Sequence, residues 1–138
     1  MRARDDFLGD WHISRRITDR FADQLGTLEG VAVLRAEGAK GLIYEETGTL
    51  LLGTAAPMQA NRSYLWTFGP DAVAVRFANG DPFHDFAPDG QSQGSDHLCG
   101  ADMYKVSYDF RDWPAWTATW SVAGPAKDYT MRTRYARP

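Results

Sequence analysis

Phe7-Leu8-Gly9-Asp10-Trp11 heads an alternating run, His12-Ile13-Ser14-Arg15-Arg16-Ile17-Thr18. Within this run Ile13, Arg15 and Ile17 share one parity, and the residues between them share the other. A period of two is typical of a strand with one buried face. A Gly-x-Trp at the head of a first strand, answered by arginines on a last strand, is a common way for a small β-barrel to begin and end. The stretch therefore predicts the first strand of a barrel.

Beyond this stretch, short apolar runs alternate with turn signals as far as the C-terminus. The clearest hairpin signal is Asn79-Gly80, and Gly69-Pro70-Asp71 marks a second turn. Further strands are expected at 27–36, 42–52, 59–68, 72–78, 81–87, 96–110, 116–122 and 128–137, the 96–110 strand being interrupted near Gly100. After the first strand, Phe21 and Leu25 lie four residues apart behind Thr18, which predicts a short helix over 18–25.

These elements predict an all-β fold: an up-and-down antiparallel barrel of about 8–10 strands with one short helix after the first strand. A barrel suits a chain with so many apolar strands, because closure removes the open sheet edges that favour aggregation. At 138 residues the chain is long enough for an ordinary core, and we expect a single domain over residues 1–138.

Charge and composition limit the partners. The chain has 15 Lys and Arg against 18 Asp and Glu, and aspartates are interspersed among its N-terminal arginines, so no basic surface for nucleic acid is expected. No run approaches the roughly 20 apolar residues that cross a bilayer, and the N-terminus lacks the apolar core of a secretory signal. The single cysteine, Cys99, can form no internal disulfide, which fits a reducing compartment. We expect a cytoplasmic protein without a membrane or nucleic-acid partner; both a monomer and a homodimer stay open.

Two resemblances extend this interpretation. Gly9-Asp10-Trp11 together with Arg132 and Arg134 resembles the pattern of lipocalin-like, or calycin, barrels, in which the tryptophan closes one barrel end under an arginine of the last strand. A second set of segments spans essentially the full chain: Phe7–Trp11, Glu45 with Gly48, Phe83-His84, His97–Tyr104 and Gly124–Tyr129. Together these segments resemble DUF6314, a family of uncharacterised bacterial proteins. The resemblances imply a lipocalin-like fold, a stabilising role for Trp11 at a closed end, and no established activity.

Two better understood barrels help to define the alternatives. Haem-binding barrels of the nitrobindin type also begin with Gly-x-Trp, but they bind iron through a histidine near the end of the chain. The last histidine here is His97, so no haem and no other cofactor is expected. Phenolic-acid decarboxylases are lipocalin-like enzymes with tyrosines, an arginine and a glutamate inside the barrel, a set that Tyr44, Glu46, Arg62 and Tyr64 resemble.

Strand parity brings polar and aromatic residues to common faces. Tyr44 and Glu46 share a face of the 42–52 run, and Arg62, Tyr64 and Trp66 share a face of the 59–68 run. If these faces point inward, the arginine and the glutamate must pair or meet a charged ligand, because an unpaired buried charge is costly. If they point outward, both are surface charges. The aromatic residues either line a pocket or fill the barrel.

The segment from His97 to Tyr104 offers chemistry of another kind. A regular strand would place His97 and Cys99 on one face and Tyr104 on the other, whereas a bulge at Gly100 would bring them together. His97 then suits a base near neutral pH, with Tyr104 or Cys99 as proton donor or nucleophile. The alternative is that His84 and His97 hydrogen-bond the backbone at the barrel mouth. The chain has no His-x-His, Glu-x-x-His or Cys-x-x-Cys, so no metal site is expected.

Three functional hypotheses remain. The first is a barrel that binds a small, partly apolar and anionic molecule. Its expected ligand-binding residues are Tyr44, Arg62, Tyr64, Trp66, His84, His97, Tyr104, Trp120 and Arg132. The second is a cofactor-free enzyme built on the same cavity, with His97, Tyr104, His84 and Glu46 as candidate catalytic residues. The third is a filled barrel that acts in protein association.

Overall fold

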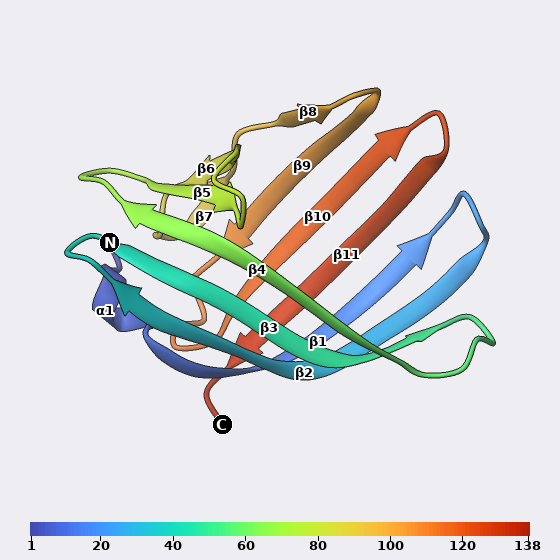
Figure 1. The fold of residues 1–138 in the computed structure, drawn as a ribbon, viewed down its shortest axis with the longest axis horizontal. Coiled ribbons are helices and arrows are strands. Elements are labelled where there is room, and N and C mark those ends of the chain that lie inside the picture. Colours follow the sequence, from blue (N-terminus) through green and yellow to red (C-terminus); the bar gives the residue numbers. More distant parts are fainter.

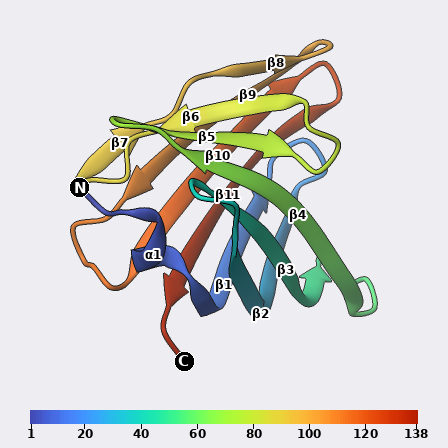
Figure 2. The same ribbon diagram turned by 60° about the vertical axis from the view of Figure 1, so that its left-hand side comes forward.

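The computed structural model describes residues 1–138 as one antiparallel sheet of 11 strands that curls into a nearly closed barrel (Figures 1 and 2). The strands are β1 (Gly9–Asp19), β2 (Gln24–Glu37), β3 (Gly41–Leu52), β4 (Met58–Phe68), β5 (Val73–Phe77), β6 (Pro82–Phe86), β7 (Gln91–Gln93), β8 (His97–Cys99), β9 (Asp102–Asp109), β10 (Trp116–Gly124) and β11 (Lys127–Ala136). One helix, α1 (Arg4–Phe7), precedes β1. The chain contains no helix with the length and apolar character needed to cross a membrane.

The connectivity is that of a meander. Strands β1 to β6 each pair with their neighbours in sequence, β9 to β11 do the same, and β11 pairs with β1. Both β7 and β8 pair with β9, at Ser92 with Tyr108 and at His97 with Tyr104, so they act as one interrupted strand. The expected all-β, up-and-down antiparallel barrel is confirmed.

The edges of the sheet meet at a seam between β6 and the segment 91–95. Across this seam the amide of Ser95 donates to the carbonyl oxygen of Asp85 at 3.0 Å. Two serine hydroxyls accept the other bonds: Ser95 Oγ from the Asp85 amide and Ser92 Oγ from the Ala87 amide, both at 2.9 Å. Hydroxyls stand here in place of a continuous strand ladder, so the seam lacks the regular backbone pairing of the other strands.

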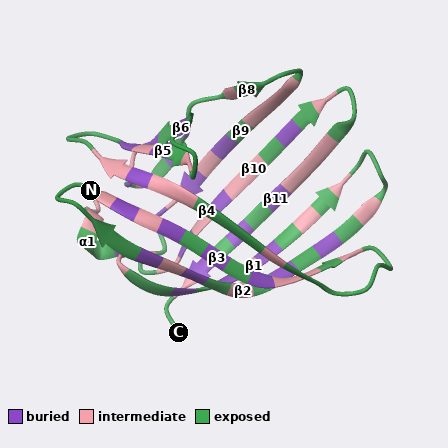
Figure 3. Cartoon of the chain, viewed as in Figure 1, coloured by how far each residue is buried: buried purple, intermediate pink, exposed green.

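Alternation along the strands decides what the barrel encloses. In β1, Trp11, Ile13 and Arg15 are buried while the residues between them are not, and in β3 Leu42, Tyr44 and Glu46 behave in the same way (Figure 3). A cluster of 19 buried residues forms the hydrophobic core. The inward parity of β1 and β3 also carries charged residues, so the core surrounds a polar centre.

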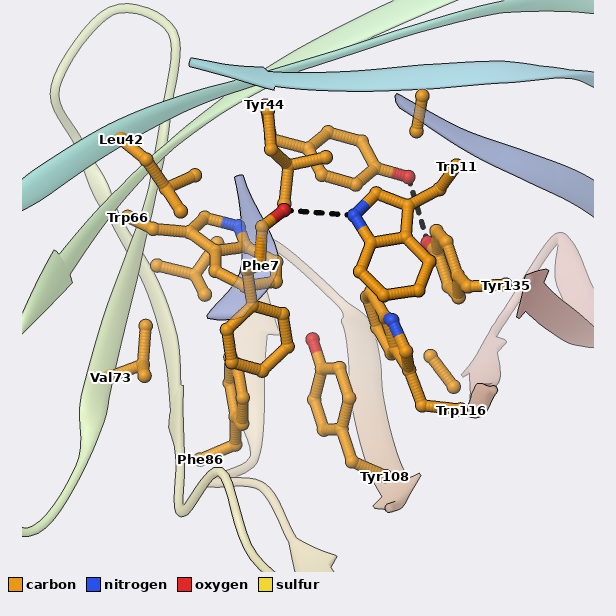
Figure 4. Packing of buried hydrophobic residues seen from close by; sticks show 14 of the residues in the cluster. Phe7, Trp11, Leu42, Tyr44, Trp66, Val73, Phe86, Tyr108, Trp116 and Tyr135 are labelled. Atoms are coloured by element: carbon orange, nitrogen blue, oxygen red, sulfur yellow. Dashed lines mark hydrogen bonds between the residues drawn. The ribbon is translucent and has the colours of Figure 1, made fainter. Parts of the chain in front are cut away.

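One end of the barrel is closed by aromatic side chains. Phe7 enters from α1 and is fully buried, and the indole Nε1 of Trp11 donates to the carbonyl oxygen of Phe7 at 2.8 Å (Figure 4). The guanidinium of Arg137 lies 3.7 Å from the centre of the Trp11 ring. It also donates to the backbone oxygens of Asp6 and Asp10, both at 3.1 Å. We refer to this part as the closed end.

The arginine over Trp11 is therefore Arg137, and the expectation of Arg132 or Arg134 was wrong. In β11 the buried residues are Met131, Thr133 and Tyr135, so the two arginines between them lie on the outer face. Arg137 follows the last strand, where the chain leaves the sheet and its side chain can reach back over the indole.

Two local predictions also differ from the structure. The helix expected over 18–25 is absent: residues 20–23 form a turn in which the amide of Ala22 donates to Asp19 Oδ1 at 3.1 Å. The expected long strand at 96–110 is a hairpin of β8 and β9, because Gly100 adopts a φ of 61° in the turn between them. A left-handed φ favours glycine, and it reverses the chain here instead of forming a bulge.

Candidate functional site

A buried ion pair occupies the middle of the barrel. Arg15 donates from Nη1 to Glu46 Oε2 at 2.7 Å, from Nη2 to Glu46 Oε1 at 2.9 Å, and from Nε to Thr133 Oγ1 at 2.7 Å. The two charged side chains are only 5% and 3% exposed. Burial by itself would raise the pKa of Glu46, but the hydrogen bonds and charge of Arg15 outweigh it, and this pKa is lowered. Glu46 is therefore ionised and balanced by Arg15.

Two tyrosines continue the network. Tyr44 Oη donates to Glu46 Oε1 at 2.6 Å, and the hydroxyls of Tyr44 and Tyr135 lie 2.7 Å apart (Figure 4). Burial raises the pKa of Tyr44 well above its ordinary value and that of Tyr135 to about 12, so both keep their protons at neutral pH. Since the Tyr44 proton is directed to Glu46, Tyr135 is the donor to Tyr44.

His84 forms a second polar pair on the opposite wall. Its Nε2 lies 2.8 Å from the hydroxyl of Tyr108, while its Nδ1 is buried without a hydrogen-bond partner. Burial, assisted by the nearby His97, lowers the pKa of His84 to about 3. His84 is therefore a neutral imidazole at physiological pH.

These groups surround a small inner chamber. Its volume is about 30 Å³, enough for roughly two water-sized atoms. The walls consist of Arg15, Tyr44, Glu46, Tyr135, His84 and Tyr108 together with Arg62, Tyr64, Trp66, Val75, Trp116, Ala118 and Trp120. Trp116 Nε1 is a second buried polar atom without a partner. The chamber is too small for an aromatic ligand.

A larger cavity, the outer pocket, opens at the end opposite α1. Its volume is about 290 Å³. Nine of its 10 lining residues are hydrophobic or aromatic, and the tenth is an arginine: Tyr64, Phe77, Phe83, Cys99, Tyr104, Trp120, Val122, Tyr129, Met131 and Arg62. An apolar wall with one convergent charge is typical of a site for a small organic ligand.

Arg62 links the two compartments. Together with Tyr64 and Trp120 it lines both the chamber and the outer pocket. Its Nε lies 3.8 Å from Glu46 Oε2, beyond hydrogen-bond distance, and its side chain is 42% exposed. Because Arg15 already balances Glu46, Arg62 contributes an excess positive charge at the boundary.

The β8–β9 hairpin places His97 opposite Tyr104, with 6.1 Å between the ring centres, and Cys99 opposite Asp102. Directly paired residues face the same side of a sheet, so the expected grouping of these residues arises from a turn at Gly100. Tyr104 and Cys99 line the outer pocket. The His97 ring lies beside this pocket, with 5.3 Å between its centre and that of the Phe83 ring in the pocket wall. The structure holds no group of three or more His, Cys, Asp or Glu residues placed to bind a metal ion.

Most of the residues singled out from the sequence meet inside the barrel. Tyr44, Glu46, Trp66 and His84 surround the chamber, Arg62, Tyr64 and Trp120 separate it from the pocket, and Tyr104 lines the pocket. Arg132 does not join them, contrary to expectation. It lies on the outer face in a recess of about 630 Å³ together with Arg16, Arg134 and Asp109, on the far side of the sheet from the chamber.

Several residues of the site were not singled out beforehand: Arg15, Tyr108, Thr133 and Tyr135. Parity contained a signal for some of them. Arg15 lies on the same face of its strand as Ile13 and Ile17, and Tyr135 lies on the same face as Met131. Which face of a strand is buried is visible in these runs, but the partner across the barrel is not.

Comparison with known proteins assigns the chain to a family. The family model DUF6314, described as a family of unknown function, matches residues 7–137, which confirms the resemblance drawn from the sequence. No curated protein matches the chain.

Solved structures of similar fold have little sequence in common with it. The S-type phycobiliprotein lyase CPES from Guillardia theta is 7% identical with a TM-score of 0.74, and the match covers 98% of this chain and 90% of the lyase. A DUF3598 protein of unknown function from Nostoc punctiforme PCC 73102 is 11% identical with a TM-score of 0.70, covering 100% of this chain and 50% of that one. EF1p2_mFAP2b bound to DFHBI is 13% identical with a TM-score of 0.52, covering 99% and 98%. At these identities the likeness concerns the fold.

Proposed function

We propose that the barrel binds a small, partly apolar and anionic molecule. The chain belongs to DUF6314, a family of unknown function. The outer pocket is the proposed binding site. Arg62 is the proposed contact for the negative group, and Tyr64, Tyr104 and Trp120 are proposed contacts for the apolar body.

The observation that carries this proposal is the outer pocket with its single charge. A volume of about 290 Å³ lies at the lower limit of ligand pockets, roughly 300–1,000 Å³, which favours a small molecule. Stacked rings, such as Phe83 and Trp120 with 4.9 Å between their centres, give the wall flat apolar surfaces. The uncompensated guanidinium of Arg62 favours an anion over a neutral or cationic ligand.

The similar barrels support the general idea without specifying the ligand. A barrel of comparable fold is bound to the small molecule DFHBI, and another is a phycobiliprotein lyase. Such a fold therefore accommodates a small organic molecule in at least one other protein. The ligand of this chain has to follow from its own residues.

The arrangement favours binding over catalysis at Glu46. Its carboxylate accepts two bonds from Arg15 and one from Tyr44. The hydrogen bonds and charge of Arg15, which outweigh the effect of burial, lower its pKa, so it is a poor base near neutral pH, where a general base needs a raised pKa.

The proposal is tested with a pair of fluorescent probes that differ in charge. These are 1-anilinonaphthalene-8-sulfonate, an anion, and N-phenyl-1-naphthylamine, a neutral molecule of similar shape. We expect both to bind in the outer pocket and Arg62→Gln to lower the affinity of the anion about tenfold, since a charge-assisted hydrogen bond contributes about 1.5 kcal/mol. The neutral probe should bind the variant as before.

The matched control is Arg132→Gln, which removes the same charge from the outer face. It should change neither affinity. Trp120→Ala should weaken both probes, because it removes part of the apolar wall. Equal binding of both probes by the Arg62 variant and the native protein would contradict an anionic ligand, and unchanged binding by the Trp120 variant would contradict the outer pocket as the site.

A further inference from the structure

We infer that the inner chamber is a subsite for a carboxylate, so that the ligand is a carboxylic acid whose flat apolar body stays in the outer pocket. This inference deepens the proposed function and rests on it. It concerns residues beyond the pocket wall, chiefly His84 and Trp116.

The first observation is a pair of buried polar atoms without partners. His84 is 5% exposed and Trp116 is 1% exposed, and neither His84 Nδ1 nor Trp116 Nε1 has a hydrogen-bond partner in the protein. Both residues line the chamber. Buried polar atoms in proteins are nearly always satisfied, because an orphaned one loses its bonds to water without replacement. Two orphans on one chamber point to an occupant with hydrogen-bonding atoms.

The second observation concerns which atoms the occupant must supply. An indole N–H is a donor only, so the occupant must accept a hydrogen bond from Trp116. Tyr108 keeps its proton because burial raises its pKa well above the ordinary value, and its hydroxyl points into the interior (Figure 4). In the His84 tautomer in which Tyr108 donates to Nε2, the neutral imidazole carries its proton on Nδ1 and offers the occupant a second donor.

Charge makes the acceptor an anion. Arg15, Arg62 and Glu46 are the ionised groups of the chamber wall, and they sum to one positive charge. The tyrosine hydroxyls on the wall remain neutral, since burial raises the pKa of Tyr44, Tyr64, Tyr108 and Tyr135. The excess positive charge of Arg62 at the boundary of the chamber, together with free donors on its wall, favours an oxyanion as the occupant.

Size favours a carboxylate as the oxyanion. The chamber is small, with a volume of about 30 Å³, and a carboxylate, with three heavy atoms, is a smaller group than a sulfonate with four or a phosphate or sulfate with five. We therefore expect the larger anions to meet Arg62 from the side of the pocket.

The shared wall shows how such a ligand would lie. Arg62, Tyr64 and Trp120 line both compartments, so the pocket and the chamber adjoin at these three side chains. A carboxylate on a narrow alkyl arm can pass this boundary while an aromatic body remains outside. The ligand class is therefore an arylalkyl carboxylic acid.

The test follows the indole N–H resonance of Trp116 by NMR, assigned with the variant Trp116→Phe. The native protein is titrated with formate at constant ionic strength, balanced by sodium sulfate, and then with 3-phenylpropionate and the neutral 3-phenylpropan-1-ol. We expect formate and 3-phenylpropionate to shift this resonance in a saturable way, and sulfate and the alcohol to leave it in place. We also expect 3-phenylpropionate to bind at least tenfold more tightly than formate, because its ring fills the outer pocket.

His84→Phe should weaken 3-phenylpropionate about tenfold and leave the anilinonaphthalene sulfonate probe unaffected, because the sulfonate does not reach the chamber. Trp116→Phe, which keeps an aromatic ring, serves as the second variant and should weaken the carboxylate in the same way. A Trp116 resonance unmoved by saturating formate and 3-phenylpropionate would show a chamber that holds water only and overturn the inference. If the sulfonate probe still binds, only the inference fails; if the probe does not bind either, the proposed function fails with it.

Discussion

The two ends of the barrel are both lined with aromatic rings, but only at one of them do the rings form the wall of a mostly apolar pocket. At the closed end Phe7 packs edge-on against Trp66, Trp113 and Trp116 with 5.1–5.6 Å between ring centres, and it is fully buried. At the open end Phe83 and Trp120 stack in the wall of a pocket of about 290 Å³. Aromatic content alone therefore does not distinguish a plug from a pocket.

The difference comes from an element outside the barrel strands. Phe7 belongs to α1, and Trp113 to the connection between β9 and β10, so the closed end is filled from beyond the sheet. The outer pocket is lined mainly by residues of the strands themselves, with no such insertion. One end is thus built for stability, and the other retains the space that a ligand requires.

The largest contrast should appear when one phenylalanine is removed from each end. Phe7→Ala should lower the free energy of unfolding by about 3–5 kcal/mol, because it leaves a cavity among packed rings. Phe77→Ala, in the wall of the outer pocket, should cost about 1 kcal/mol and weaken both fluorescent probes. Urea unfolding and probe titration measure the two effects. Equal losses of stability would contradict the division between plug and pocket.

The polar centre should respond more strongly than the surface beside it. Glu46→Gln leaves Arg15 without its buried counter-charge and should cost about 3 kcal/mol, less than a full deletion because the amide still accepts a hydrogen bond. The neighbouring Glu45, which pairs with Arg35 on the outer face and is 48% exposed, provides the control. Glu45→Gln should change the free energy of unfolding by less than about 1 kcal/mol. A similar loss of unfolding free energy in both variants would show that the central ion pair contributes no more to stability than the surface pair.

Acid should weaken the barrel through His84. Burial and the nearby His97 lower the folded-state pKa of His84 to about 3, against roughly 6.5 in an unfolded chain, so the unfolded state binds more protons between these values. The stabilisation is complete above about pH 6.5 and falls by up to about 1.4 kcal/mol per pH unit as the pH decreases toward 3. His84→Phe should reduce this slope between pH 7 and 5 in urea titrations. His12→Phe on the outer face should retain it, and a slope that His84→Phe does not alter would refute this role.

The smallest expected effect separates the two candidate arginines over Trp11. Arg137→Ala removes a cation–π contact and two bonds to backbone oxygens, and should cost about 1 kcal/mol. Arg134→Ala should cost less than about 0.5 kcal/mol, because this side chain is exposed and its nearest carboxylate is 3.8 Å away. Thermal or urea unfolding of both variants distinguishes them. A larger loss of unfolding free energy for Arg134→Ala than for Arg137→Ala would indicate that the arginine of the last strand stabilises the closed end.

Parity in the sequence predicted the strands and several of the residues that line the two compartments. It grouped Tyr44 with Glu46 and Arg62 with Tyr64 on faces that do point inward. The Arg15–Glu46 pair was beyond its reach, because the two residues stand on β1 and β3, which do not pair with each other, and parity does not predict contacts between strands that are separated by a third.

The errors have local causes. Arg132 was expected inside although its neighbours Met131 and Thr133 occupy the buried parity of β11. The closed-end arginine follows the last strand, where strand parity gives no guidance. At Gly100 a single glycine is compatible with both a bulge and a turn, and only the pairing of β8 with β9 distinguishes them.

The seam gives the barrel a property that neither end has alone. The other strands of the barrel are joined by regular backbone ladders, so we expect a change in its circumference to occur at the seam. Strand β6, on one side of the seam, carries His84 on the chamber wall and Phe83 on the pocket wall. Because β6 carries residues of both walls, a widening at the serine hydroxyls would enlarge the chamber and the outer pocket together.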